Sequence, residues 1–340
     1  MKNELYNKSI LITGGTGSFG KAFVRYLLNL KKKDAPRRIV VFSRDELKQF
    51  EMAKDISQEK YSNIRYFLGD VRDKSRLNIA LADIDYVVHA AALKQVSISE
   101  YNPMEFIKTN VIGAQNLIET AYLNGVTKVI ALSTDKASSP INLYGATKLC
   151  SDKLFVSANN LKSEFKKKLT SFSVVRYGNV FGSRGSVVPA FLKQIEKNQL
   201  EITNKDMTRF SITLKKSIEF VYECMFKSYG GEIFVPKIPS YKLLDLAAAI
   251  SKKCKIRIVG TRPGEKIHEE LISEHESEIT YDVKTHLVII SEPSLGKIYL
   301  KNGAKKQKIN ESYNSSQNKV FLTTNELKKL IEDYKKQLII

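Results

Sequence analysis

Residues 9–23 read SILITGGTGSFGKAF, an apolar run that leads into a glycine-rich turn and then into a segment with helical periodicity. The glycines at positions 14, 15, 17 and 20 satisfy both G-x-G-x-x-G and G-x-x-G-x-x-G. Glycines allow a tight turn and let the backbone approach a pyrophosphate, while the following helix offers free N–H groups. A purely structural turn is the alternative, but the position between a strand and a helix favours dinucleotide binding.

The first half of the chain continues this alternation of strand and helix. Strands are expected at residues 9–13, 38–42, 63–68, 86–91 and 128–133, and helices at 21–30 and 110–124. Fully apolar strands that alternate with helices predict a parallel sheet covered on both faces. The fold class is therefore expected to be α/β, with a doubly wound parallel sheet of the Rossmann type.

The second half is less regular. Strands are expected at residues 172–176, 231–235 and 255–259, and helices at 188–197, 216–229 and 242–253. Near the end, Thr323 and Glu326 fit a capping box that opens a last helix with an apolar stripe. Residues 301–320 are polar enough to be mobile or loosely packed.

The length of 340 residues, with 43% hydrophobic residues, allows one large core and a smaller lobe. We expect a Rossmann domain over residues 1–178, to which residues 208–236 return. Residues 179–340 are expected to form mainly a smaller substrate-binding lobe and a C-terminal tail.

The formal net charge of +19 raises nucleic-acid binding as one function class. Lysines outnumber arginines by 43 to 12, however, and readout of base edges depends mainly on arginine. The basic runs at 31–38 and 162–169 fall where loops or helix ends are expected. A lysine-rich solvated surface that attracts an anionic small molecule is therefore favoured.

Other broad classes are also not expected. The sequence has no apolar run of 18 residues and no signal peptide at its start, so no membrane span is expected. Cys150, Cys224 and Cys254 are far apart and are predicted to be reduced, buried thiols of a cytoplasmic protein. The histidines form no H-x-x-x-H pair, so no metal site is expected, and His89 is expected to pack in the core.

The residues after the second strand bear on which dinucleotide binds. NAD enzymes usually place a carboxylate here for the ribose 2′-hydroxyl. This chain has Ser43 and Arg44, which suit a 2′-phosphate, while Asp45 comes one or two places late. The pattern favours NADP. After the third strand, Asp70 is expected at the adenine edge, with a simple turn carboxylate as the alternative.

Residues 132–148, LSTDKASSPINLYGATK, contain the chain's only Y-x-x-x-K pattern, at Tyr144 and Lys148. Chance alone would give about two matches, so the position of the pattern carries the argument. The pair shares one helix face, where the lysine would lower the tyrosine pKa and also hold the nicotinamide ribose. Ser133 precedes it at the carboxyl end of a strand, where such sheets bind ligands. Simple hydride transfer leaves Asp135 and Lys136 without a role.

Nine short motifs extend from about Ser9 to Lys266: TGGTGSFG, SRDELKQ, GDVRD, HAAALK, KTNVIGAQN, LSTDKASSPINLYGATK, VVRYGNVFGSRGSV, MTRFSIT and RPGEK. In this order and spacing they resemble the extended short-chain dehydrogenase/reductase superfamily. Within it they are similar to the UDP-N-acetylglucosamine 4,6-dehydratases that invert C5 on the way to pseudaminic acid. The resemblance implies oxidation at C4, loss of water across C5–C6 and return of hydride to C6. It also implies a homo-oligomer, either a dimer or a hexamer.

The resemblance also assigns roles to the catalytic stretch. Tyr144 takes the C4 hydroxyl proton, Lys136 removes the C5 proton and Asp135 protonates the departing C6 oxygen. Retaining dehydratases have Asp-Glu here, so Lys136 indicates inversion. Desolvation and the charge of Lys148 are expected to lower the pKa of Lys136, and Asp135 is expected to keep its proton.

Three alternatives stay open for this stretch. Asp135 and Lys136 could form a purely structural ion pair. A nucleotide-sugar 4-epimerase would share Tyr144 and Lys148 but needs no C5 base. A non-catalytic NADP-binding sensor or scaffold would need none of the four residues intact.

The implied cofactor site comprises Gly14, Thr16, Gly17, Ser18, Phe19, Gly20, Ser43, Arg44, Asp45, Lys48, Asp70, Val71, Ala90, Ala91, Lys94, Leu132, Ser133, Tyr144 and Lys148. The implied contacts to the UDP-sugar are Lys94, Asn179, Arg209, Arg262 and Glu265. Two positions depart from the pattern of relatives. Gln95 stands where histidine is frequent and Ser211 where an aromatic residue is common, so the local contacts there are expected to differ.

Overall fold

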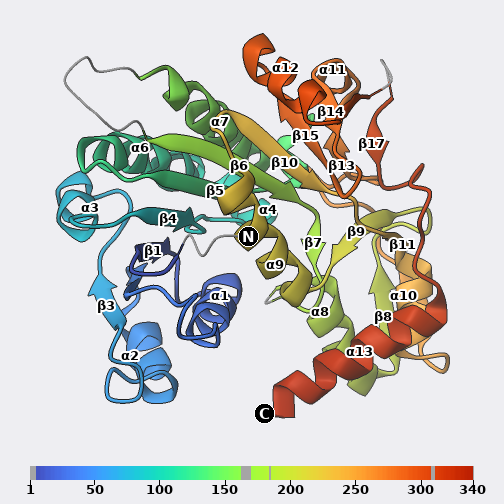
Figure 1. Cartoon of the computed structure of the whole chain (residues 1–340). Coiled ribbons are helices and arrows are strands. Elements are labelled where there is room, and N and C mark those ends of the chain that lie inside the picture. Colours follow the sequence, from blue (N-terminus) through green and yellow to red (C-terminus); the bar gives the residue numbers. More distant parts are fainter. Residues whose placement is uncertain (1–4, 162–169, 184, 308–310, 340) are drawn as a thin grey trace.

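The computed structural model describes residues 5–161, 170–183, 185–307 and 311–339. The basic run expected as a loop or helix end at 162–169 lies outside these residues. A broad central sheet with helices on both faces occupies one part of the molecule, and a smaller lobe lies beside it (Figure 1). No helix in the described residues combines the length and the apolar character needed to cross a bilayer.

The central sheet has ten strands in the described residues, in the order β16-β14-β15-β10-β6-β5-β4-β1-β2-β3. They are β1 (Ser9–Thr13), β2 (Arg38–Ser43), β3 (Ile64–Leu68), β4 (Tyr86–His89), β5 (Lys128–Thr134), β6 (Ser171–Tyr177), β10 (Glu232–Pro236), β14 (Thr280–Asp282), β15 (His286–Ile290) and β16 (Lys305–Lys306). From β3 to β10 each strand runs parallel to its neighbours. The predicted doubly wound sheet is confirmed, and its strand order reverses beside β1, where such folds bind ligands.

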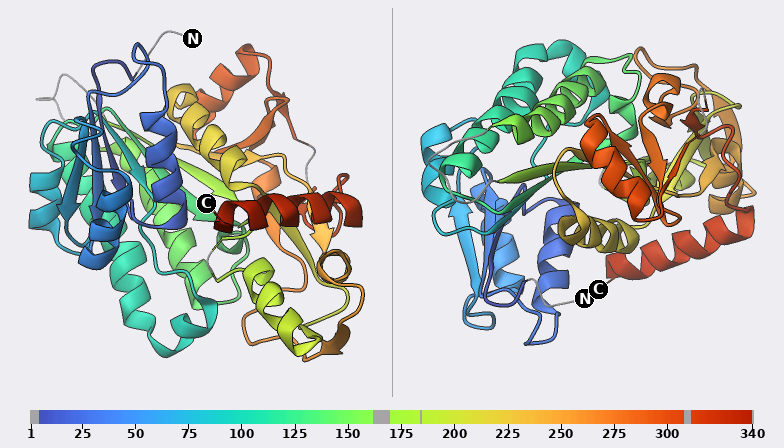
Figure 2. Two further views of the ribbon diagram at one scale, coloured as in Figure 1. Left: turned by 90° about the horizontal axis from the view of Figure 1, so that it is seen from below. Right: turned by 45° about the horizontal axis from the view of Figure 1, so that its top comes forward.

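Helices cover both faces of this sheet. They are α1 (Ser18–Leu28), α2 (Glu46–Asp55), α3 (Lys74–Ala80), α6 (Gly113–Leu123), α7 (Leu143–Ser157) and α9 (Leu214–Lys227). Figure 2 shows α1 beside α9 on one face, while α6 lies with α3 and α7 on the other. Because both faces are covered, the strands are apolar throughout, and Ile10, Leu11 and Ile12 are fully buried.

The helix expected at 110–124 is the last part of a longer helical region. It begins with α4 (Val96–Tyr101) and α5 (Pro103–Phe106), and a π-helical stretch (Ile107–Ile112) then leads into α6. Asn110 in this stretch is buried, and its side chain bonds the backbone of Leu93 in both directions. This pairing fixes the loop after β4, which lines the cavity described below.

The smaller lobe has its own core, at the lower right in Figure 1. Its elements are β7 (Asn179–Val180), β8 (Gln199–Ile202), β9 (Thr208–Ile212), β11 (Ser240–Lys242), β12 (Lys255–Ile258), α8 (Val187–Gln194), α10 (Leu243–Ile250) and α13 (Thr324–Ile339). The predicted capping box is confirmed, since Glu326 N–H donates to Thr323 Oγ1 and Thr323 N–H donates to the Glu326 carboxylate. Leu327 and Ile331 then bury the apolar face of α13 against α10.

The later segments follow the sequence-based expectation only in part. Of residues 208–236, β10 joins the central sheet, but β9 pairs with β7 and β11 in a separate three-stranded sheet. Beyond them, β15 pairs antiparallel with β10 and extends the central sheet. The remaining elements are β13 (Glu270–Ile272), α11 (Glu274–Ser277), α12 (Pro293–Lys301) and β17 (Tyr313–Asn314). The boundary at residue 178 stays a prediction.

Two smaller expectations hold only in part. Part of the polar segment 301–320 is firmly packed, because the Tyr313 hydroxyl donates to the carbonyl oxygen of Ile238 at 2.9 Å and Ser315 is fully buried. The three cysteines are free thiols, as expected, but only Cys224 is buried, while Cys254 is partly buried and Cys150 is exposed. It lies on the outer face of α7, which the helical periodicity did not resolve.

Candidate active site

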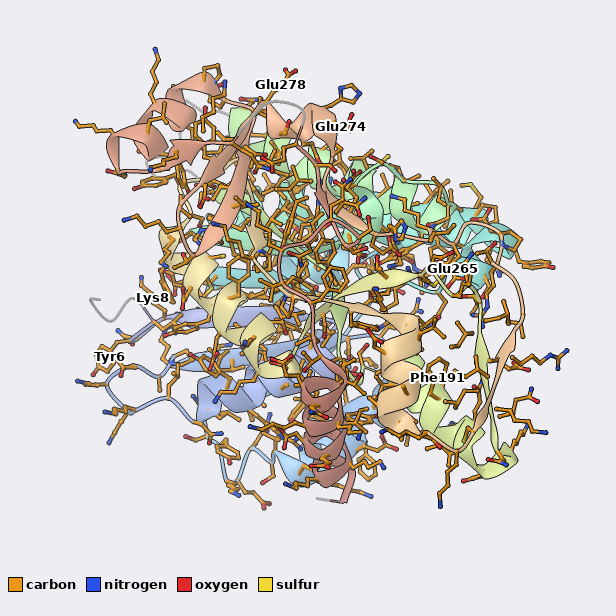
Figure 3. All side chains as sticks on the ribbon, turned by 90° about the vertical axis from the view of Figure 1, so that its right-hand side faces the viewer. Tyr6, Lys8, Phe191, Glu265, Glu274 and Glu278 are labelled. Carbon is orange, nitrogen blue, oxygen red and sulfur yellow. The ribbon has the colours of Figure 1, made fainter. Side chains whose placement is uncertain are left out.

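A cavity of about 1310 Å³ follows the carboxyl edge of the central sheet and reaches into the smaller lobe. The glycine turn and the ends of β2, β4 and β5 form one wall, and β7, β9 and the loop at 262–266 form the other. Pockets for one small ligand enclose about 300–1,000 Å³, so this cavity is large enough for two. Phe191 and Glu265, which line it, lie on the lobe side of the molecule, away from Tyr6 and Lys8 (Figure 3).

The glycine turn fits a pyrophosphate closely. Gly14 has a left-handed φ of +64°, and a Cβ there would lie 2.9 Å from the backbone of Ala91. At Gly20 a Cβ would lie 2.5 Å from the Cα of Gly15, so the helix packs directly on the turn. Gly17 is the N-cap of α1 and has no side chain to accept from the first turn. The turn therefore presents an uncapped helix N-terminus to the cavity, as phosphate binding requires.

The end of β2 places both a cation, Arg44, and a carboxylate, Asp45, in the cavity wall, and the carboxylate is engaged elsewhere. Asp45 caps α2, because its carboxylate accepts from the Lys48 N–H at 3.0 Å. The Lys48 side chain also bonds this carboxylate and lowers the pKa of Asp45. Arg44 is 52% exposed and lies 3.6 Å from Asp70. The late position of Asp45 is thereby explained, since it starts a helix.

Tyr144 and Lys148 stand one turn apart on α7, and both are buried in the cavity wall. Burial raises the pKa of Tyr144 to about 12, although the charge of Lys136 and a hydrogen bond with Thr134 act in the opposite direction. The expected lowering of the tyrosine pKa is therefore wrong, because desolvation outweighs the neighbouring charge. The cation that favours its ionisation is Lys136, which the helical spacing did not suggest.

Lys148 belongs to a row of buried polar groups behind the cavity. Its ammonium donates to the carbonyl oxygen of Leu132 at 2.8 Å, and burial lowers its pKa while Asp152 acts in the opposite direction. Asp152 accepts from the Ser133 hydroxyl at 2.8 Å and from Arg176 at 3.2 Å. This row joins β5, α7 and β6 and fixes Ser133 and Lys148. Arg176 and Asp152 were not predicted, although an arginine inside an apolar strand was a usable signal.

A second charged group lies where β5 ends. Lys136 Nζ is 3.0 Å from Asp135 Oδ1 and 3.0 Å from Glu269 Oε1. The two acids are only 1% and 2% exposed. Each also has one buried oxygen without a hydrogen-bond partner in the described residues, Asp135 Oδ2 and Glu269 Oε2. Lys136 and Glu269 line the cavity, whereas Asp135 lies just behind its wall.

The protonation of this group follows from burial and charge. Burial lowers the pKa of Lys136, but the charges of Asp135 and Glu269 outweigh burial and raise it above its ordinary value. The expected lowering is wrong because Glu269 adds a second carboxylate. Burial raises the pKa of Asp135, as expected of an acid, and Glu269 adds to this while Lys136 opposes it. For Glu269, the charges of Lys136 and Arg209 outweigh burial and lower the pKa. Asp135 thus holds a proton more readily than Glu269.

The predicted substrate-binding residues gather on the lobe side. Asn179 on β7 lines the cavity, and its amide oxygen is buried without a hydrogen-bond partner in the described residues. Arg209 on β9 is buried and lies 3.4 Å from Glu265 and 3.8 Å from Glu269. Arg262 is exposed, and its backbone N–H donates to Glu265 at 3.3 Å. Glu265 therefore contacts the guanidinium of Arg209 and the backbone of Arg262.

Most of the predicted site residues thus share one cavity. Every predicted cofactor and substrate residue lines it, including Lys94, whose partial burial in the wall lowers its pKa. Among the predicted catalytic residues, Asp135 alone does not reach the cavity surface. His89 is buried beneath it, with Nδ1 2.8 Å from the Thr13 hydroxyl. Ser211 lies outside this cavity, and Gln95 lies in its wall. The roles of all these residues stay predictions.

Comparison with known proteins places this cavity in context. Residues 10–291 match the family described as polysaccharide biosynthesis protein. The inverting UDP-N-acetylglucosamine 4,6-dehydratase of Campylobacter jejuni is 51% identical over 335 residues, which cover 95% of this chain and 97% of that protein. A UDP-glucose 4-epimerase of Rickettsia bellii is 42% identical, with 96% and 95% covered.

A solved structure agrees with these relatives. The protein Pen from Bacillus thuringiensis is 38% identical and superposes with a TM-score of 0.87, covering 97% of this chain and 99% of that one. The chain therefore belongs to the polysaccharide biosynthesis family of extended short-chain dehydrogenase/reductases, beside the inverting UDP-N-acetylglucosamine 4,6-dehydratases.

Proposed function

We propose that this protein catalyses the C5-inverting 4,6-dehydration of UDP-N-acetylglucosamine to UDP-2-acetamido-2,6-dideoxy-β-L-arabino-hex-4-ulose, for surface-glycan synthesis of the pseudaminic acid type. The observation that carries the proposal is the position of Lys136, which lines the cavity between two carboxylates and influences Tyr144. Elimination across C5–C6 needs a base for the C5 proton and an acid for the C6 oxygen. A lysine beside a protonated carboxyl group offers both.

The glycine turn and Arg44 support NADP as the cofactor. A bound nicotinamide dinucleotide would supply the hydride acceptor for C4 and the hydride donor for C6. We assign its pyrophosphate to the start of α1 and its nicotinamide ribose to Lys148. Arg44 can bind a 2′-phosphate bidentately, while Asp45 is engaged in capping α2.

Tyr144 acts first, as the base for the C4 hydroxyl. The positive charge of Lys136 opposes the effect of burial on the pKa of this phenol, so the phenolate that accepts the C4 proton forms more easily while Lys136 is protonated. Once C4 is a ketone, the C5–H bond is acidic and the amine of Lys136 removes its proton. Asp135, whose pKa is raised, then protonates the C6 oxygen, which leaves as water.

The substrate diphosphate suits the two arginines of the lobe. Arg209 and Arg262 bind phosphate oxygens, and Asn179 supplies a free amide oxygen for the sugar. We also infer a homo-oligomer in the cytoplasm. Free thiols are typical of that compartment, and the exposed apolar side chains of Tyr101 (88% exposed) and Met104 suit a subunit contact.

One experiment tests the reaction directly. The purified protein, loaded with NADP, is incubated with UDP-N-acetylglucosamine in D₂O and the sugar is followed by proton NMR. A C6 methyl group, deuterium at C5 and L-arabino couplings are expected. A galacto product that keeps its C6 hydroxyl would identify a 4-epimerase instead, the activity named for the Rickettsia relative. An unchanged spectrum with NADP bound would contradict the proposal and favour a non-catalytic role.

A further inference from the structure

Glu269 is a buried acid that the mechanism above does not use. It precedes β13 and is held firmly, because its N–H donates to Ser315 Oγ at 2.9 Å and its carbonyl oxygen accepts from the Ser315 N–H at 2.8 Å. Its Oε1 is 3.0 Å from Lys136 Nζ, and its Oε2 has no partner in the described residues. It lines the cavity, so it lies beside the reacting sugar rather than in a remote part of the core.

The reaction makes opposite demands on Lys136. During C4 oxidation its positive charge helps Tyr144 to ionise. To remove the C5 proton, however, the same nitrogen must carry a free electron pair. One proton must therefore leave Lys136 between the two steps, and it must go to a group within hydrogen-bond reach.

Among the residues that the structure describes, two carboxylates are within that reach, and one of them is free to take the proton. Asp135 and Glu269 both lie 3.0 Å from the ammonium. Asp135 must keep its own proton for the C6 oxygen. Glu269 has a lowered pKa and is therefore ionised, so it can accept a proton. It also lines the cavity, whereas Asp135 lies behind the cavity wall.

We propose that Glu269 is the proton store of Lys136, an inference that rests on the dehydratase function proposed above. Before elimination an N–H bond of the ammonium breaks and an O–H bond forms on Glu269, leaving a neutral amine. The amine then takes the C5 proton, the C–H electron pair forms the C5–C6 double bond, and the C6 oxygen leaves as water with the proton of Asp135. When hydride returns to C6, C5 takes up a proton from water, and Tyr144 releases to water the proton that it took from the C4 hydroxyl. Lys136 passes a proton to Asp135, and Glu269 returns its proton to Lys136.

The surroundings of Glu269 suit this exchange. The charged groups that face it are Lys136 and Asp135 after β5, Arg209 on β9, and Lys266 in the preceding loop. Proton transfer within the ion pair creates no net charge in the buried site, which limits its cost. Glu269 acts through Lys136 and is therefore a positioning residue.

The test compares Glu269→Gln and Glu269→Asp with a matched control, Glu270→Gln. Glu270 is the adjacent acid in the chain, but its carboxylate accepts from Ser139 at 2.7 Å. Each full-length protein is loaded with NADP, its bound cofactor is measured, and it is mixed rapidly with UDP-N-acetylglucosamine. The rise and decay of reduced-cofactor absorbance separate C4 oxidation from the later steps. Substrate deuterated at C5 shows which phase contains loss of the C5 proton.

In Glu269→Gln the rise should keep its wild-type rate, whereas the decay should slow by roughly 100-fold and show an increased C5 isotope effect. The decay should recover as pH rises, because hydroxide then removes the ammonium proton. The decay rate of Glu269→Asp should lie between those of Glu269→Gln and wild type, and the decay rate of Glu270→Gln should equal that of wild type. A decay as fast as wild type, or an equal slowing of both phases without recovery at high pH, overturns the proposal.

If Glu269→Gln fails to retain NADP, the decay of reduced-cofactor absorbance is measured in Glu269→Asp instead. This variant keeps the carboxylate charge but has a shorter side chain. An unslowed decay in that variant overturns the proposal. Failure of the proposed function is distinct, because wild-type protein would then form no dehydrated sugar at all.

Discussion

The two ends of the cavity are built in different ways. At the cofactor end the backbone makes the shape, since a Cβ at Gly14 or Gly20 would come within 2.9 or 2.5 Å of neighbouring main chain. At the catalytic end side-chain charges make the site, with Lys136 held 3.0 Å from Asp135 and 3.0 Å from Glu269. The first end should therefore be sensitive to added volume. The second should be sensitive to charge even where volume is kept.

The largest effect is expected from Lys136→Gln. The amide can still donate to both carboxylates, but it cannot take up a proton, so dehydration should fall by roughly 1,000-fold or more. Bound NADP should be retained, because the glycine turn is untouched. Product formation followed by NMR and cofactor content after gel filtration are the measurements.

Lys153→Gln is the matched control, since Lys153 is exposed on α7 and should leave the rate unchanged. Dehydration at the wild-type rate in Lys136→Gln would remove the basis for a lysine base at C5. Loss of NADP from Lys136→Gln would instead show that cofactor binding at one end of the cavity depends on the charged group at the other end.

The second prediction concerns added volume at the cofactor end. Gly20→Ala places a methyl group 2.5 Å from the Gly15 Cα, so α1 must move away from the turn. We expect a loss of about 1–3 kcal/mol in the free energy of unfolding and much weaker NADP binding. Urea unfolding and equilibrium titration with NADP measure these quantities.

Gly125→Asn provides the comparison. Gly125 also has a positive φ (+67°), but a Cβ there meets no atom within 4 Å, and asparagine tolerates this conformation. It should leave NADP affinity unchanged. Equal NADP affinity in Gly20→Ala and wild type would mean that close backbone packing does not shape the phosphate site.

The same contrast explains what the sequence could predict. The strand, turn and helix of the cofactor end lie within twenty consecutive residues, so local pattern is sufficient to predict them. Asp135 and Lys136 are also adjacent and were found. Glu269 was missed because only folding brings it beside Lys136, and the residues IHEE around it carry no sign that one acid is buried.

The sequence also could not predict how strongly burial and neighbouring charges shift the pKa values of the site residues. Helical spacing places Lys148 beside Tyr144, but it contains no information on desolvation, which dominates and raises the tyrosine pKa. The extension of the sheet by β15 depends on antiparallel pairing with β10 across about fifty residues of chain, which local pattern does not specify.

The third prediction concerns a buried titratable group beneath the cofactor end of the cavity. His89 is buried against Thr13, and burial lowers its pKa to about 3. The unfolded chain binds this proton near pH 6.5, so stability is complete above that pH and is lost as pH falls toward 3. Between pH 7 and 5.5 this histidine should account for about 1 kcal/mol of lost unfolding free energy.

Urea unfolding of wild type and His89→Asn at both pH values measures the difference. His286, whose pKa is also lowered, to about 4, remains in both proteins and cancels. The variant should lose about 1 kcal/mol less than wild type over this interval. An identical loss in the two proteins would mean that His89 is not the titrating group.

The last prediction concerns Arg44→Ala, which removes an exposed cation at the cofactor end. Its side chain is 52% exposed and makes an ion pair of 3.6 Å with Asp70, so a 2′-phosphate can compete for the guanidinium. NADP affinity should fall by roughly 10-fold while NAD affinity stays unchanged, and the difference should shrink at high salt. Arg25→Ala is the control, because Arg25 is equally exposed on α1 but does not line the cavity. Equal losses for NADP and NAD would assign Arg44 to general attraction of anions, and the cofactor end would then select its ligand by backbone shape alone.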